Sequence, residues 1–145
     1  MIGTTDRVFV DTNVLIYAHD RDAGVKREVA RQLLADLWRS GQGVISTQVL
    51  QEFYVNITRK IATPLPRATA REVVRNYGVW RVMTPGPSEV ARASELEERH
   101  QVSFWDAMIL LAARDGGATV LASEDLSHGQ VIEGVRIVNP FLVDG

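Results

Sequence analysis

Short segments rich in β-branched residues alternate with longer segments of helical periodicity along the chain, and this alternation limits the choice of fold more than any other feature. Strands are predicted over residues 7–10, 44–45, 81–83, 118–122 and 135–138. Helices are predicted over residues 11–18, 25–39, 47–60, 67–80, 88–100 and 103–114. Strands separated by helices usually pair in parallel, with helices covering both faces of the sheet. The sequence therefore predicts a three-layer α/β/α fold with a central parallel sheet.

The chain is expected to form one domain over residues 1–145, because this length fits a domain of ordinary size and no linker or repeat divides it. It contains no cysteine, which excludes thiol catalysis, zinc fingers and iron–sulfur clusters. The first residues lack the pattern of a signal peptide, and the longest hydrophobic run, residues 107–113, is far shorter than the ~20 residues that span a bilayer. These features predict a cytoplasmic protein with no membrane partner.

Positive charge is concentrated in residues 55–83, which we call the basic segment. The whole chain carries a net charge of −2, but this segment holds six basic residues against Glu72 alone: Arg59, Lys60, Arg67, Arg71, Arg75 and Arg81. The arginines at 67, 71 and 75 share one face of a predicted helix, where their repulsion favours an anionic partner. Because arginine binds phosphate in a bidentate manner, a nucleic-acid contact is the preferred interpretation, and a solvated helix face is the alternative.

Four acidic residues follow predicted strands or begin predicted helices. Asp11 ends the first strand, and Asp125 follows the strand 118–122. Glu52 lies about one turn into the helix after the second strand, and Asp106 lies in the first turn of the helix 103–114. Ligands of open α/β sheets bind where the parallel strands end, so these carboxylates are expected to converge there. An oxygen-only cluster without cysteine or histidine favours Mg²⁺ or Mn²⁺ over zinc.

Each of these acids also has a structural interpretation. Asp11 suits the N-cap of the helix that follows it, and Asp125 suits a turn. Asp106 lies three residues after Ser103, a spacing that on its own favours a capping box. Glu52 is compatible with a solvated position on its helix. The case for a common site therefore depends on the four acids together.

The same residues carry a resemblance to a known family. The segment from Val8 to Ala18, with Asp11, Thr12 and Asn13 at its centre, resembles the opening motif of the PIN domain, particularly that of the VapC toxins of bacterial toxin–antitoxin pairs. Residues 46–53 and 103–107 resemble its second and third acidic motifs, and residues 123–126 its last. The four motifs occur in the family's order and cover essentially the whole chain.

The resemblance implies a PIN fold and an endoribonuclease that uses Mg²⁺ or Mn²⁺. It implies that the catalytic and metal-binding residues are Asp11, Glu52, Asp106 and Asp125, and that the supporting residues are Thr12, Asn13, Ser123 and Glu124. Glu124 and Asp125 are adjacent acids, and either one could be the fourth ligand; Asp125 holds the motif position. RNA contacts are expected from Arg59, Lys60, Arg67, Arg71 and Arg75. A small cognate antitoxin and a second copy of the chain, forming a homodimer, are the expected protein partners.

Other enzyme classes with a similar first motif need residues that this sequence lacks. A haloacid-dehalogenase-like phosphatase and a response-regulator receiver also place an aspartate after the first strand, but both need a lysine late in the chain, and the lysines here are Lys26 and Lys60. No phosphate-binding loop of the form GxxxxGK is present. The remaining alternative is a degenerate PIN-like module that binds RNA or protein without cutting. Among the aromatic residues, Tyr54, Tyr77 and Trp80 could stack on bases, but core packing is favoured, and Trp105 is expected to be structural or to line the site.

Overall fold

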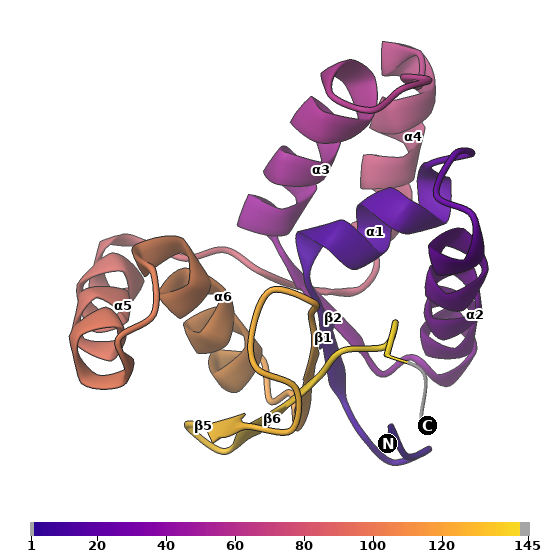
Figure 1. Ribbon diagram of the computed structural model, residues 1–145. Helices are drawn as coiled ribbons and strands as arrows, with labels where there is room; N and C mark the ends of the chain where they lie inside the picture. The colour runs from indigo at the N-terminus through magenta and orange to yellow at the C-terminus, as the bar shows by residue number, and fades with distance from the viewer. Residues whose placement is uncertain (1, 143–145) are drawn as a thin grey trace.

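The computed structural model describes residues 2–142 of the chain (Figure 1). The helices are α1 (Thr12–His19), α2 (Val25–Ser40), α3 (Thr47–Arg59), α4 (Arg67–Tyr77), α5 (Pro87–His100) and α6 (Phe104–Asp115). The strands are β1 (Val8–Val10), β2 (Gly43–Ser46), β3 (Arg81–Met83), β4 (Val120–Ala122), β5 (Val131–Ile132) and β6 (Val135–Val138). Every predicted helix and strand has a counterpart within three residues at either end. None of the described helices is long and apolar enough to cross a membrane.

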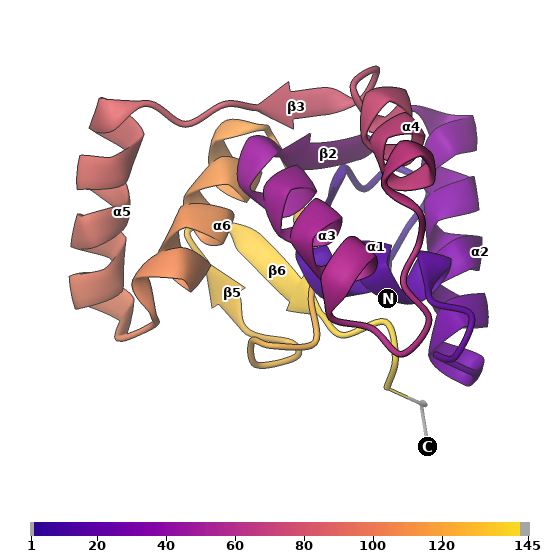
Figure 2. The ribbon, with the colours of Figure 1, turned by 90° about the horizontal axis from the view of Figure 1, so that it is seen from above.

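The strands form one sheet in the order β3-β2-β1-β4-β6-β5. All neighbouring strands are parallel except β5 and β6. Helices α5 and α6 lie on one side of the sheet and α1 and α2 on the other (Figures 1 and 2). The pair α3–α4 extends from the edge at which β1 and β2 end (Figure 1). The predicted three-layer α/β/α class is therefore confirmed.

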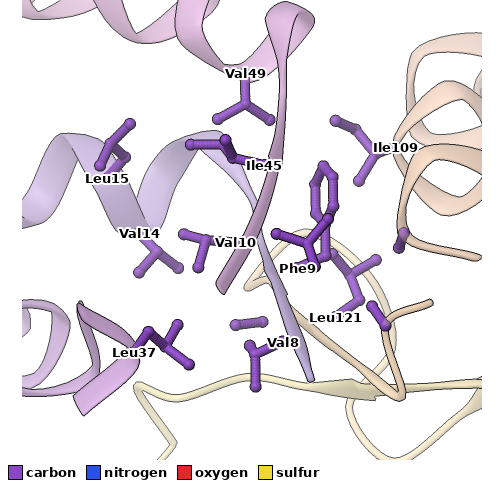
Figure 3. Close-up of a cluster of buried hydrophobic side chains, with 14 of the residues drawn as sticks. Val8, Phe9, Val10, Val14, Leu15, Leu37, Ile45, Val49, Ile109 and Leu121 are labelled. Carbon is purple, nitrogen blue, oxygen red and sulfur yellow. The ribbon is translucent and has the colours of Figure 1, made fainter. Parts of the chain in front are cut away.

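The core lies on both faces of the central strand β1, whose Val8, Phe9 and Val10 are fully buried. Figure 3 shows Leu37 of α2 on one side of this strand and Ile109 of α6 on the other. A strand covered on both faces must be apolar throughout rather than alternating, which is why a short run of valine and phenylalanine suffices to specify it. Burial on this scale fixes the direction in which β1 delivers the next residue, Asp11.

The antiparallel strand β5 was not predicted from the sequence. It is two residues long and is joined to β6 by a turn in which Glu133 and Gly134 have φ angles of 52° and 80°. A two-residue hairpin turn of type I′ has positive φ at both positions, and glutamate is an uncommon choice for the first. The carboxylate of Glu133 lies 3.0 Å from Arg114 Nη1 and 3.3 Å from Arg99 Nη1, and these ion pairs hold the turn.

Helix α4 ends at Tyr77, three residues before the predicted end, because the chain must turn there to enter β3. The ring of Trp80 then packs over Gly43 at the start of β2, where a Cβ atom would lie 2.5 Å from the indole. Tyr77 and Trp80 contact each other with ring centroids 4.8 Å apart, and both contact Trp38 of α2. Tyr77 is buried and Trp80 half-buried, so these two aromatic residues serve packing, as favoured from the sequence.

Candidate active site

The first acid, Asp11, is buried at the junction of β1 and α1. Its side chain is only 6% exposed. Its Oδ1 accepts a hydrogen bond from the backbone N–H of Thr12 at 2.7 Å, so Asp11 caps α1. Its Oδ2 accepts a hydrogen bond from the hydroxyl of Ser123 at 2.7 Å. Since Ser123 directly follows β4, which pairs with β1, the two predicted polar clusters meet at the end of these neighbouring strands.

The electrostatics of Asp11 connect it to two further acids. Burial raises its pKa from 3.8 to about 6, although the hydrogen bonds from Ser123 and Thr12 act in the opposite direction. The negative charges of Asp125 and Glu52 raise the pKa further. Asp11 therefore carries its charge at neutral pH in an unfavourable environment, which a cation would relieve.

Glu52 faces the same region from α3. Its Oε2 accepts a hydrogen bond from the hydroxyl of Thr12 at 2.7 Å, and its Oε1 accepts one from Gln48 Nε2 at 3.1 Å. Thr12 is the first residue of α1, so this contact joins the start of α1 to α3 next to Asp11. The Oγ of Ser46 accepts from the N–H of Val49 and caps α3, which fixes where that helix begins.

Asp125 reaches the same region from the loop after β4. Both of its carboxylate oxygens accept from Asn13 Nδ2, at 3.2 and 3.1 Å. Its backbone N–H donates to the hydroxyl of Ser123 at 3.2 Å. The pKa of Asp125 is raised by partial burial first and then by the charges of Asp106, Glu124 and Glu52, of which Asp106 contributes most. The charges of Asp106 and Glu52 therefore act on Asp125, and the charge of Asp125 acts on Asp11.

Asp106 lies at the start of α6, where it takes part in a helix cap and is also available to bind a cation. The hydroxyl of Ser103 accepts from the backbone N–H of Asp106 at 3.0 Å, so Ser103 caps α6. The carboxylate of Asp106 does not complete a reciprocal capping box, because it accepts no hydrogen bond from any residue between 2 and 142. The cap therefore uses the backbone of Asp106 and leaves its carboxylate without a hydrogen-bond donor in the described part of the chain.

The adjacent acid Glu124 has different partners. It accepts a short hydrogen bond from the hydroxyl of Tyr17 and forms an ion pair with Lys26, whose Nζ lies 2.9 Å from Oε2. The same ammonium lies 4.8 Å from the centre of the Tyr17 ring. Sequence reasoning did not single out Tyr17 or Lys26. Tyr17 lies within the first motif, but Lys26 begins a separate helix, and nothing in its position along the chain indicates this contact.

The basic segment covers the end of α3, all of α4 and β3. Arg59 lies seven residues beyond Glu52 on α3, about 10 Å further along the helix axis. Arg71 and Arg75 border a groove of about 480 Å³ between α3 and α4, whose apolar surface includes Leu50 and Val74. Arg75 pairs with Glu72 at 2.7 Å. Among the described residues, no three acidic or histidine side chains lie close enough together to hold a metal ion as they stand.

Fold and site together define a mostly parallel α/β protein with acidic side chains at the edge where its central strands end. The family profile described as PIN domain matches residues 8–132, and the chain belongs to this family. Among solved structures, the fold is similar to that of VapC20 from Mycobacterium tuberculosis, described as a sarcin-ricin loop cleaving toxin. The TM-score is 0.64 at 24% sequence identity, and the match covers 81% of this chain and 91% of that one. No match was found among curated protein sequences.

Proposed function

We propose that the protein is a metal-dependent endoribonuclease that hydrolyses RNA phosphodiester bonds. The observation that carries the proposal is the set of four carboxylates delivered by four separate elements to the edge where β1, β2 and β4 end. Asp11 supports it most directly, because its buried charge is costly without a cation and its pKa is raised by two of the other acids. A site that served only to cap helices would not need this coupling.

The residues present fit a divalent cation. Asp11, Glu52, Asp106 and Asp125 offer carboxylate oxygens only, which suits Mg²⁺ or Mn²⁺. Binding would draw the carboxylates closer together than they lie now, and the free carboxylate of Asp106 is the one least restrained by hydrogen bonds. The chemistry that such a cation supplies is a lowered pKa for an attacking water and stabilisation of charge on the leaving oxygen.

The supporting residues orient the acids. Ser123 and the backbone of Thr12 direct the two oxygens of Asp11, the hydroxyl of Thr12 directs Glu52, and the amide of Asn13 directs Asp125. Groups that hydrogen-bond to metal-binding side chains fix their orientation in this way. Glu124, held by Tyr17 and Lys26, supports the loop that carries Asp125 rather than the cation itself.

The biological role that we propose is that of a VapC-type toxin in the cytoplasm, acting as a homodimer and silenced by a small antitoxin. The PIN family membership and the similarity of fold to VapC20 support this role. We also propose that Arg59, Lys60, Arg67, Arg71 and Arg75 contact RNA phosphates outside the acidic site. Arg67 and Arg71 support this, because both are exposed and neither has an ion-pair partner within residues 2–142.

The test is cleavage of unstructured RNA by the purified protein with Mg²⁺, with Mn²⁺ and with EDTA. Cleavage should require a divalent cation and should be lost in Asp106→Asn. Glu98→Gln, which removes an exposed acid of α5 that has no side-chain partner in the described chain, serves as the matched control and should cleave normally. RNA binding without cleavage under every condition would instead identify a degenerate module.

A further inference from the structure

Trp105 is a large aromatic side chain exposed immediately beside the acidic site. Its side chain is 63% exposed, and the next residue along α6 is Asp106. Of the ten phenylalanine, tyrosine and tryptophan residues, all within the described chain, only Trp105 and Trp38 are exposed. An exposed tryptophan offers a flat apolar surface on which a ligand can stack.

The position of Trp105 is fixed by its neighbours. Its ring makes an edge contact with Phe104 at a centroid distance of 5.3 Å and an interplanar angle of 75°. Phe104 in turn packs against the small core cluster formed between α5 and α6. Because Ser103 caps α6, the first turn that carries both rings has a defined start. The indole is therefore braced on one edge while most of its surface stays open.

Gln48 connects Trp105 to the second acid and adds a polar edge. Its Nε2 lies 3.5 Å from the backbone oxygen of Trp105 and 3.1 Å from Oε1 of Glu52. Both partners are acceptors, so the amide nitrogen must face them and the amide oxygen must face elsewhere. That oxygen accepts no hydrogen bond from residues 2–142. The backbone of Trp105 and the unused acceptor of Gln48 thus lie together beside Glu52, and Asp106 is the next residue of α6.

We propose that Trp105 and Gln48 form a nucleobase subsite, in which the base of an unpaired nucleotide next to the scissile phosphate stacks on the indole. This inference rests on the proposed ribonuclease function and names a determinant of its substrate binding. The charge of the site explains why stacking is needed. Four carboxylates repel an RNA phosphate, and an arginine placed among them would pair with the acids instead. Stacking provides affinity without charge, and it accepts any base.

Trp38 offers a matched control within the same chain. It is 41% exposed, but it packs against Tyr77 and Trp80, whose ring lies over the start of β2. The acids follow the other ends of the strands, so Trp38 and Trp105 lie at opposite edges of the sheet. Truncating either residue removes an exposed indole, but only Trp105→Ala removes one beside the acidic site.

The experiment measures binding and cleavage of a fluorescein-labelled, unstructured 12-nucleotide RNA of mixed sequence, after the position of its cut has been mapped. Trp105→Ala should weaken binding by about 5- to 150-fold, which corresponds to the loss of one stacked base. Trp105→Tyr should recover most of the affinity, and Trp38→Ala should bind within about twofold of the wild type. KM should rise in Trp105→Ala, while the Mg²⁺ concentration that gives half-maximal cleavage should not change.

Two further readouts separate stacking from other roles. The slope of log affinity against log salt should be the same in Trp105→Ala and the wild type, because stacking displaces no counterions, whereas the double variant Arg71→Ala/Arg75→Ala should flatten it. Replacing one nucleotide beside the cut by an abasic one should weaken binding to the wild type but add nothing to the defect of Trp105→Ala.

The outcomes distinguish the subsite from the proposed function. If the wild type cleaves the RNA and Trp105→Ala binds and cleaves it equally well, the subsite is wrong and the ribonuclease stands. If no RNA is cleaved but Trp105→Ala still loses affinity, Trp105 stacks on an unpaired base of bound RNA, and both the nuclease and the place of that base next to a scissile phosphate are wrong. Additive effects of the abasic nucleotide and Trp105→Ala would also overturn the subsite, because they would place the base elsewhere.

Discussion

The acidic site has two halves that the fold holds very differently. In the inner half, Asp11 is buried, and Asp11 and Glu52 both accept hydrogen bonds from hydroxyl groups. In the outer half, Asp125 is exposed and accepts only from the amide of Asn13, while the carboxylate of Asp106 accepts no hydrogen bond within the described chain. The inner acids are thus arranged before any ligand arrives, whereas the outer acids are held by fewer donors.

The difference shows how like charges can be gathered without unfolding the edge of the sheet. Burial of Asp11 is tolerated because donors from Thr12 and Ser123 partly replace the lost hydration. The outer acids keep part of their hydration instead, since Asp125 is exposed and Asp106 is half-buried. Asp106 also lies in the first turn of α6, where the helix dipole favours a negative charge by roughly 0.3–1 kcal/mol. Removing an inner acid should therefore affect both chemistry and stability, and removing an outer acid mainly chemistry.

The largest effect is expected for Asp11→Asn in the inner half. The asparagine keeps the size of the side chain and an oxygen for the N–H of Thr12, but it removes the charge that would hold a cation. RNA cleavage with Mg²⁺ should fall by more than the roughly 10–100-fold that is typical of supporting residues. Initial rates on a labelled RNA measure this. A variant that retains cleavage within tenfold of the wild type would remove Asp11 from the proposed metal site.

The same substitution should alter the pH dependence of stability. The pKa of Asp11 is about 6 in the folded protein against 3.8 ordinarily, so its stabilising contribution is complete below pH 3.8 and is lost as pH rises through 6. Without metal, the free energy of unfolding of the wild type relative to Asp11→Asn should fall by about 2–3 kcal/mol between pH 4 and pH 7. Urea unfolding in EDTA measures the difference.

Added Mg²⁺ provides the control for that measurement. A cation that binds only the folded state stabilises it, and it favours the ionised form of Asp11. The loss of stability with rising pH, taken relative to Asp11→Asn, should therefore shrink in the wild type. Free energies that run parallel in the two proteins from pH 4 to pH 7 in EDTA would contradict the account of a costly buried charge.

A third, smaller effect is expected when the supporting residues of the two halves are replaced by alanine. Ser123→Ala leaves the buried Oδ2 of Asp11 without its donor and should reduce cleavage or Mg²⁺ affinity by about 10–100-fold. Asn13→Ala removes the donor of an exposed carboxylate that water can replace, so its effect should be smaller. Ser127→Ala, an exposed serine of the same loop, is the control and should have no effect. A larger loss in Asn13→Ala than in Ser123→Ala would reverse the proposed ranking.

Features of the structure that are specified by neighbouring residues in the sequence could be predicted, and features that depend on distant residues could not. The buried strand at 8–10 and the caps at Asp11, Ser46 and Ser103 are specified by adjacent residues and were predictable. The four acids could also be found from the sequence, because each lies in its own short motif. The turn at Glu133 was not predictable, because its stability comes from arginines of α5 and α6 that are distant in sequence.

Within the site, the limit is again sequence distance. The spacing of Ser103 and Asp106 predicted a capping box, but whether the carboxylate folds back on its own helix or faces other acids depends on what surrounds it. The contact of Lys26 with Glu124 spans 98 residues and leaves no periodic signal. Trp105 was predicted either to be structural or to line the site. The sequence could not decide between these, because the exposure of a side chain depends on the assembled surface and not on the residue type.

The smallest effect is expected where the two halves meet, at the adjacent acids Glu124 and Asp125. The Lys26–Glu124 pair is partly exposed, and such pairs contribute roughly 0–1 kcal/mol, so Glu124→Gln should leave the fold intact. The glutamine can still accept from Tyr17, and the loss of a negative charge should lower the pKa of Asp125 slightly. Cleavage at neutral pH should then stay within about threefold of the wild type, as is usual for changes of this energy. Asp125→Asn, the matched change one residue later, should lose far more. Side-by-side rates with Mg²⁺ decide between the two acids: an equal or greater loss in Glu124→Gln would make Glu124 the fourth ligand and would require its ion pair with Lys26 to open when the cation binds.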